Sequence, residues 1–75
     1  MKNRLDTKLE RERIGRIVRA RREELRLTLR ELSTESGVAL GALSQLERGH
    51  NFSAHTLIRV CDTLDLRISV VTEVG

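Results

Sequence analysis

The amino-acid sequence predicts a single, mainly helical domain of four to five short helices that ends in a β-strand. Apolar residues recur at spacings of three and four through most of the 75 residues, which is the helical period. Capping residues and glycines divide this pattern into short helices. After Leu64 the apolar spacing changes to two, which is typical of a strand. A chain of this length buries a modest core and often gains stability by oligomerising.

The first two helices follow from spacing and capping signals. We expect the first over residues 6–25, with an inward face made of Leu9, Ile14, Ile17 or Val18, Arg21 and Leu25. The second begins after Thr28, because Glu31 stands three residues later and the two residues form a capping box. Gly37 is expected to end this helix in a left-handed turn.

Two further helices are expected over residues 40–48 and 54–64. Gly49 ends the first of them, and Ser53 caps the start of the second. The inward positions of the three later helices are predicted to be Leu29, Leu32, Leu43, Leu46, Leu57, Val60, Cys61 and Leu64.

The last residues carry a period-two, β-branched pattern that predicts a strand over residues 66–74. A lone strand cannot satisfy its own backbone hydrogen bonds, and no second strand is predicted in this chain. The expected partner is the same strand of a second copy, paired antiparallel about a two-fold axis. A fifth short helix or a disordered tail are the alternatives. The dimer contacts are predicted at Ile68, Val70, Val71 and Thr72.

The net charge of +3 conceals an uneven distribution along the chain. Residues 1–30 hold 11 Lys or Arg and 5 Asp or Glu, a balance of +6. Residues 31–75 hold 3 Arg and 6 acidic residues, a balance of −3. Basic charge gathered at one end fits a polyanionic partner. Because glutamates are interspersed among these arginines, a solvated, charge-laced helix fits the same residues.

Composition argues against several other classes of protein. One cysteine excludes an intramolecular disulfide and a cysteine-based zinc finger, and Cys61 is expected to be a core residue. His50 and His55 are poorly arranged for a metal site or general-base catalysis. No enzymatic activity, metal or cofactor is therefore predicted. No apolar window approaches the roughly 18 residues of a membrane span, so we expect a cytoplasmic chain with no membrane partner.

The two central helices and their glycine-bearing turn are typical of a helix-turn-helix. Gly37 can take the positive φ of the turn, and Ser33 is small where the helices cross. Residues 14–66 resemble the Cro/C1-type (XRE-like) family of phage repressors, antitoxins and bacterial regulators. The landmarks of the resemblance are "LTLREL", "GV" at the turn, "LSQLERG" and the pattern from Ser53 to Leu57.

The resemblance implies a lambda-repressor-like bundle with a helix-turn-helix DNA-binding domain over residues 6–66. Residues 1–5 would be a flexible arm, and residues 67–75 a dimerisation tail like those of antitoxins whose C-terminal strands form an intermolecular sheet. It also implies that Glu47 pairs with Arg22, in an ion pair that ties the first helix to the third.

The family's docking mode implies that six residues face the major groove, namely Ala39, Leu40, Gly41, Ala42, Ser44 and Gln45. Gln45 can make a bidentate contact to adenine, and Ser44 can donate or accept a hydrogen bond. Leu40 and Ala42 can pack on thymine methyl groups. Gly41 lets the backbone come close to the DNA.

Phosphate contacts are expected at both ends of the helix-turn-helix, from Thr28, Leu29, Arg30, Arg48, His50 and Asn51. Arg19 and Arg26 are weaker candidates. Leu29 departs from the glutamine that the family often has there. Ala39 replaces the usual Ser or Thr cap, at a cost of about 1 kcal/mol.

Together these features predict a homodimeric, sequence-specific DNA-binding transcriptional regulator of a bacterium or phage, acting at the nucleoid. Binding to a pseudo-palindromic operator is expected, and repression of transcription is the favoured outcome. The alternative is an antitoxin that binds a protein toxin and regulates its own gene. The apolar patch at residues 40–43 and the predicted strand are the features that could serve such a partner.

Overall fold

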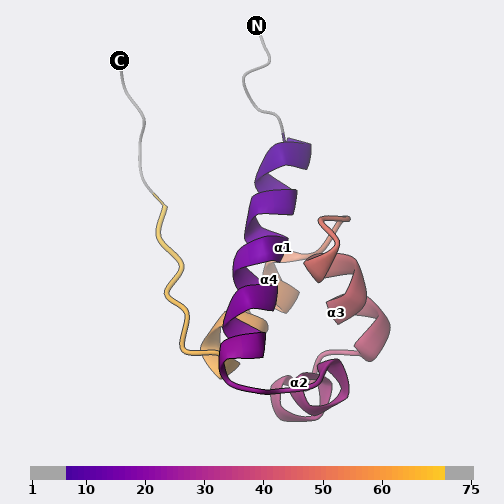
Figure 1. The fold of residues 1–75 in the computed structure, drawn as a ribbon. Helices are drawn as coiled ribbons and strands as arrows, with labels where there is room; N and C mark the ends of the chain where they lie inside the picture. The colour runs from indigo at the N-terminus through magenta and orange to yellow at the C-terminus, as the bar shows by residue number, and fades with distance from the viewer. Residues whose placement is uncertain (1–6, 71–75) are drawn as a thin grey trace, which may run out of the picture.

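A computed structural model describes residues 7–70, which contain four α-helices (Figure 1). These are α1 (Thr7–Glu24), α2 (Leu29–Ser36), α3 (Leu40–Glu47) and α4 (Ala54–Thr63). Each helix begins and ends within one residue of the bounds predicted for it. The mainly helical class is therefore confirmed.

The core lies where the four helices meet. α1 packs against α3, and α2 packs against both α3 and α4. The buried core residues are Val18, Leu32, Val38, Leu43, Leu46, Val60 and Leu64. Leu29 and Leu57 are partly buried against this cluster, and Cys61 is buried. The inward faces predicted for the three short helices are confirmed.

The inward face predicted for α1 is only partly right. Val18 takes the core position, and Ile14 packs against the core from its edge. Of the alternatives Ile17 and Val18, it is Val18 that lines the core, and Ile17 is 43% exposed. Leu9 and Leu25 are 60 and 41% exposed, so the prediction that these two line the core is wrong. α1 has 18 residues, whereas α2 and α3 have 8 each. The start of α1 therefore extends past the bundle, as Figure 1 shows, which explains the exposure of Leu9.

The turn of the helix-turn-helix forms as the capping signals predict. The Thr28 backbone N–H donates to the Glu31 carboxylate, and the Glu31 N–H donates to the Thr28 hydroxyl at 3.0 Å. Gly37 ends α2 at φ 75°, a left-handed conformation that favours glycine. The Ser33 hydroxyl donates to the Val38 carbonyl at 2.6 Å, across the turn. Ser33 thus fastens the turn as well as fitting beside it.

A glycine that the sequence pattern did not single out sets the distance between α1 and α3. Gly15 is buried on α1, and a methyl group there would lie 2.6 Å from the Leu46 carbonyl oxygen and 2.7 Å from that of Glu47. Both of these atoms belong to the backbone of α3, so a side chain could not be accommodated by a change of rotamer. The backbones approach this closely because residue 15 has no Cβ.

The predicted C-terminal strand is not confirmed among the described residues. α4 ends through Leu64 and Asp65, and the Leu66 N–H donates to the Cys61 carbonyl at 2.8 Å. Residues 66–70 then run without regular structure, because the described chain offers no second strand to pair with them. Ile68 and Val70 are exposed there. Two other predicted dimer residues, Val71 and Thr72, and the predicted arm over residues 1–5 lie outside the described residues.

Gly15→Ala should destabilise the fold. Overpacking costs about 1–3 kcal/mol, which outweighs the gain of about 1 kcal/mol in helix propensity. Gly41→Ala is the matched control, since a methyl group at residue 41 of α3 would meet nothing within 4 Å. It should raise the free energy of unfolding by up to about 1 kcal/mol. Urea unfolding monitored by circular dichroism measures both, and equal effects of the two substitutions would refute the close approach at Gly15.

Candidate nucleic-acid interface

α3 presents an outer face that the bundle does not cover. Leu43 and Leu46 are buried beneath it. The six residues predicted to face DNA lie on the exposed or half-buried side, namely Ala39, Leu40, Gly41, Ala42, Ser44 and Gln45. The structure therefore leaves Ala39, Leu40, Gly41 and Gln45 exposed and Ser44 half-buried, whereas Ala42 packs partly against the core.

The first turn of α3 lacks a side-chain cap. Ala39 occupies the N-cap position with β-like backbone angles, and its methyl side chain accepts no hydrogen bond. α2 and α4 differ, because the hydroxyls of Thr28 and Ser53 cap them. The first N–H groups of α3 therefore have no capping side chain, and they lie at the positive end of the helix dipole, which favours an anion.

Gly41 stands in the middle of this face without a structural reason inside the chain. Its φ is not positive, and a Cβ there would be in open space. Glycine inside a helix costs about 1 kcal/mol relative to alanine. The packing of the described bundle therefore does not require glycine at residue 41.

The turn between α3 and α4 gathers polar and basic groups around Gln45. Three of the predicted phosphate residues, Arg48, His50 and Asn51, line a hollow of about 390 Å³ beside it. α1 contributes Lys8, Arg11 and Glu12 to the same hollow. Lys8 and Arg11 are cations that sequence reasoning missed, because nothing in the spacing indicates that the start of α1 meets this turn.

Arg11 fixes that meeting point between α1 and the turn. Its Nε donates to the Gly49 carbonyl at 3.1 Å, and one of its terminal nitrogens donates to the Thr7 hydroxyl at 3.0 Å. Gly49 itself has φ 80°, and a Cβ at this position would lie 2.7 Å from Cγ of Glu12. The turn is thus held against the first turns of α1.

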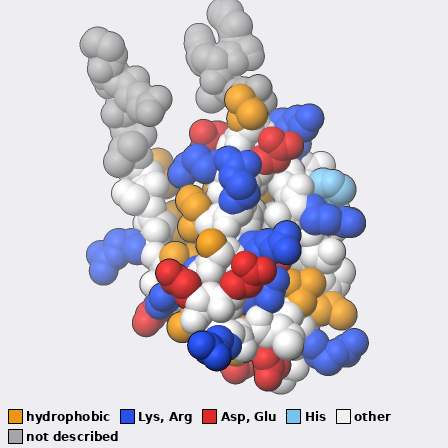
Figure 2. All heavy atoms as spheres, viewed as in Figure 1, with side chains coloured by type: hydrophobic (Ala, Val, Ile, Leu, Met, Phe, Trp, Pro, Cys, Tyr) orange, Lys and Arg blue, Asp and Glu red, His pale blue; other side chains and the backbone are white. Residues whose placement is uncertain are grey.

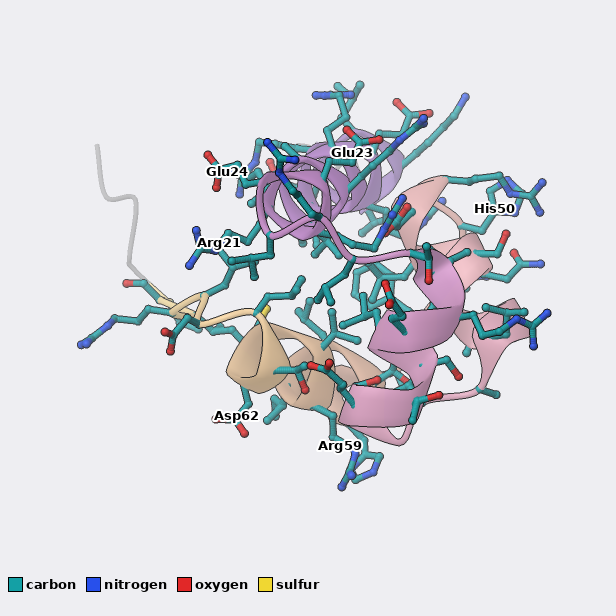
Figure 3. All side chains as sticks on the ribbon, turned by 60° about the horizontal axis from the view of Figure 1, so that its bottom comes forward. Arg21, Glu23, Glu24, His50, Arg59 and Asp62 are labelled. Atoms are coloured by element: carbon teal, nitrogen blue, oxygen red, sulfur yellow. The ribbon has the colours of Figure 1, made fainter. Side chains whose placement is uncertain are left out.

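Gln45 and His50 are connected by a backbone hydrogen bond and by a contact between their side chains. The His50 backbone N–H donates to the Gln45 carbonyl at 2.9 Å. The His50 ring nitrogen Nδ1 lies 2.7 Å from Oε1 of the Gln45 side chain. Both side chains are exposed, and Figure 3 shows His50 at the edge of the molecule, far from Arg59 and Asp62 of α4.

The other predicted phosphate residues form a separate group at the start of α2. Thr28 and Arg30 line a second hollow together with Glu31, Thr34 and Glu35, and Leu29 packs against the core. The Thr28 N–H and hydroxyl are both engaged in the capping box. The structure therefore does not bring the six predicted phosphate residues into one site, and the α2 group carries two carboxylates.

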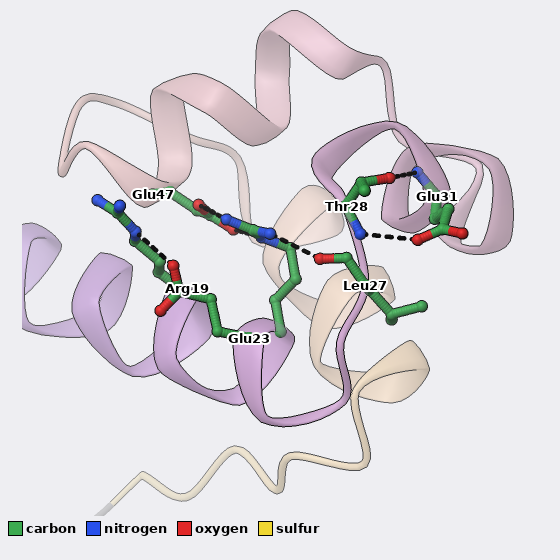
Figure 4. A network of polar contacts seen from close by, with 7 residues as sticks. Arg19, Glu23, Leu27, Thr28, Glu31 and Glu47 are labelled. Atoms are coloured by element: carbon green, nitrogen blue, oxygen red, sulfur yellow. Dashed lines mark hydrogen bonds and ion pairs between the residues drawn. The ribbon is translucent and has the colours of Figure 1, made fainter.

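Arg22 and Glu47 form an ion pair between α1 and α3 (Figure 4). Two guanidinium nitrogens donate to the two carboxylate oxygens, at 2.6 and 3.1 Å. A third hydrogen bond, at 2.7 Å, runs from Arg22 to the Leu27 carbonyl. The side chains are only 14 and 7% exposed. The hydrogen bond to Glu47 raises the pKa of Arg22 above its usual value, although burial opposes the shift.

Several other arginines of α1 are bound within the protein. Arg13 pairs with Glu10, and Arg19 pairs with Glu23. Arg21 bonds Glu24 and donates from Nε to the Leu64 carbonyl at 2.9 Å. Figure 2 shows the basic side chains over α1 interleaved with acidic ones. For these arginines the charge-laced helix is the better interpretation of the basic excess.

Arg59 is a further structural arginine, which no sequence pattern indicated. Its Nε donates to the Ser36 carbonyl at 2.8 Å, so α4 satisfies the C-terminal end of α2. The guanidinium lies beside Gly37, where a Cβ would be 2.7 Å from it. The pairing depends on how α4 returns past α2, which local patterns do not encode.

Other kinds of site find no support in residues 7–70. No three His, Cys, Asp or Glu side chains there are arranged to hold a metal ion. Burial raises the pKa of the Cys61 thiol, which keeps it in its less reactive form. None of the helices in this part of the chain is both long and apolar enough to cross a membrane.

The Arg22–Glu47 pair should couple strongly in a double-mutant cycle. Arg22→Met leaves the Glu47 carboxylate nearly buried without its partner and should cost about 3 kcal/mol. Arg22→Met with Glu47→Leu should cost less than the sum of the single changes, by at least about 1 kcal/mol. The exposed Arg13–Glu10 pair is the control, with an expected coupling below about 0.5 kcal/mol. Additive losses at Arg22 and Glu47 in urea unfolding would contradict this role.

Comparison with known proteins agrees with this geometry. The model of a helix-turn-helix family matches residues 18–71. The transcriptional regulator ClgR of Mycobacterium tuberculosis, from strains CDC 1551 and H37Rv, is 42% identical over 64 residues, which cover 84% of this chain. The chain spans 57% of the length of these relatives. The protein belongs to the helix-turn-helix family of the Cro/C1 type.

Proposed function

We propose that the protein is a DNA-binding transcriptional regulator that binds a pseudo-palindromic operator as a homodimer. The observation that carries this proposal is the uncovered face of α3, which has a bare N-terminus and a polar turn at its other end. A helix-turn-helix places such a face in the major groove. The matched relatives are named transcriptional regulators, which supports the same function.

Base contacts would come from the outer face of α3. Gln45 and Ser44 offer hydrogen-bonding groups to base edges. Leu40 and Ala42 would pack on thymine methyl groups, and Leu40 is exposed enough to do so. Gly41 and Ala39 would let the backbone approach the bases. Since few of these groups hydrogen-bond, DNA shape and half-site spacing would supply part of the specificity.

Phosphate contacts would flank this face. Arg48, His50 and Asn51 lie at one end of α3, where Lys8 adds a further cation. Arg30 lies at the start of α2, where the capping box occupies the N–H groups of Thr28 and Glu31, so the backbone N–H groups of Leu29 and Arg30 would add to the set. Contacts of this kind orient the protein on the duplex and carry no sequence information.

A homodimer would use the apolar side of the bundle that faces away from α3. A groove of about 300 Å³ runs between α1, α4 and the residues after α4, and Ile17, Leu57 and Ile68 are among its lining. Ile58 and Val70 are exposed nearby. A second copy would cover these side chains, and pairing of the two tails through Ile68, Val70, Val71 and Thr72 would extend the contact.

Repression is the proposed outcome of binding, at the bacterial nucleoid. A domain of this size regulates most simply by occupying a promoter. An antitoxin role is the second candidate, because the exposed Leu40 and the apolar groove could also contact a protein partner. A toxin that co-purifies with the chain and displaces it from DNA would favour that role.

Selection from a random DNA library should enrich an inverted repeat with half-sites about one helical turn apart. Gln45→Ala should then weaken binding to the selected site about tenfold, because it removes the most versatile polar reader. Its sedimentation behaviour should match that of the unsubstituted chain, which serves as the control for assembly. Failure to enrich any sequence would contradict the proposed function.

Gly41→Ala should separate stability from binding. The fold should gain stability, whereas the added methyl group should weaken binding to the selected DNA by about tenfold or more if the backbone approaches the base edges there. Fluorescence anisotropy with labelled duplex measures the affinity. Unchanged affinity would remove residue 41 from the contact surface.

A further inference from the structure

The Gln45–His50 pair carries an inference about which base the protein reads, and it rests on the proposed function. The pair is anchored by the backbone bond from His50 to Gln45 as well as by the 2.7 Å side-chain contact. Because both side chains are exposed, the contact adds little to folding stability. Its consequence lies in how the amide of Gln45 is presented to a ligand.

The chemistry of the contact fixes the position of one proton. An amide oxygen only accepts hydrogen bonds, so Nδ1 of His50 must carry the hydrogen that it donates to Oε1 of Gln45. The amide nitrogen Nε2 of Gln45 then keeps both of its hydrogens for other acceptors. With Oε1 turned toward the α3–α4 turn, Gln45 faces outward as a donor.

The charges around His50 are compatible with this arrangement. The hollow beside it is lined by Lys8, Arg11 and Glu12 of α1 and by Arg48 after α3. The Arg11 guanidinium is engaged by Gly49 and Thr7. Among the described residues, His50 is the group that holds Oε1 of Gln45.

The orientation of the amide decides which base edge Gln45 fits. A bidentate contact to adenine needs a donor for N7 and an acceptor for the N6 amino group, whereas guanine presents two acceptors, N7 and O6. We propose that His50 positions Gln45 as a double donor, so that Gln45 selects guanine over adenine. His50 is a positioning residue in this proposal, and it acts on specificity through Gln45.

The test compares library selections for the unsubstituted chain and four variants. Gln45→Ala first identifies the base pair that Gln45 reads, as the position whose preference disappears. The unsubstituted chain should prefer guanine there. His50→Ala frees the amide to rotate and should shift the preference toward adenine by roughly fivefold or more.

Two further variants make the result specific to the hydrogen bond. His50→Lys keeps a donor that cannot accept, so it should retain the guanine preference even if its added charge strengthens binding overall. His55→Ala removes the exposed histidine at the start of α4 and should leave the preference unchanged. Nitrogen-15 NMR of the imidazole should find the hydrogen of His50 on Nδ1.

Each adverse outcome is distinct. A guanine preference that survives His50→Ala, or an adenine preference in the unsubstituted chain, would overturn the positioning role while leaving the proposed function intact. A Gln45→Ala profile identical to that of the unsubstituted chain would overturn it as well. If no chain enriches any sequence, the proposed function itself fails.

Discussion

The close approach of α1 to α3 is the constraint on which the rest of the structure depends. Gly15 lets the two backbones approach each other. The ion pair between Arg22 and Glu47 connects the same two helices further along α1. With Leu43 and Leu46 buried on the inner side, α3 has only its outer side left to present. Packing against α1 and the core therefore determines which side of α3 is exposed.

The cationic side chains of this molecule have two roles, because some bind backbone carbonyls within the fold and others lie exposed on the surface. Arg22, Arg21 and Arg59 each satisfy a backbone carbonyl in another part of the fold. These guanidiniums hold the ends of helices and turns, where carbonyls lack helical partners. Other cations lie beside Gln45 at the α3–α4 turn, and of these Arg11 also has a structural role, because it donates to the Gly49 carbonyl. The net charge of the chain could not distinguish structural cations from exposed ones, since it counts both alike.

The sequence was most informative where structure is local. The capping box at Thr28, the left-handed Gly37 and the buried faces of the short helices follow from spacing within a few residues. Left-handed turns held by Arg26 and Asp65 carry no such signal, because neither is glycine. The role of Gly15 and the position of Lys8 at the hollow beside the α3–α4 turn depend on how distant elements meet. The Gln45–His50 contact could not be foreseen either, because it depends on the path of that turn.

In the proposed complex, DNA binds the outer face of α3 and the turn that follows it. Titration of the nitrogen-15-labelled protein with its selected duplex, followed residue by residue, tests this placement. The largest amide shifts are expected at residues 39–45 and 48–51, with little change around Arg59. Shifts confined to the apolar groove between α1 and α4 would contradict it and would assign binding to the opposite side of the bundle.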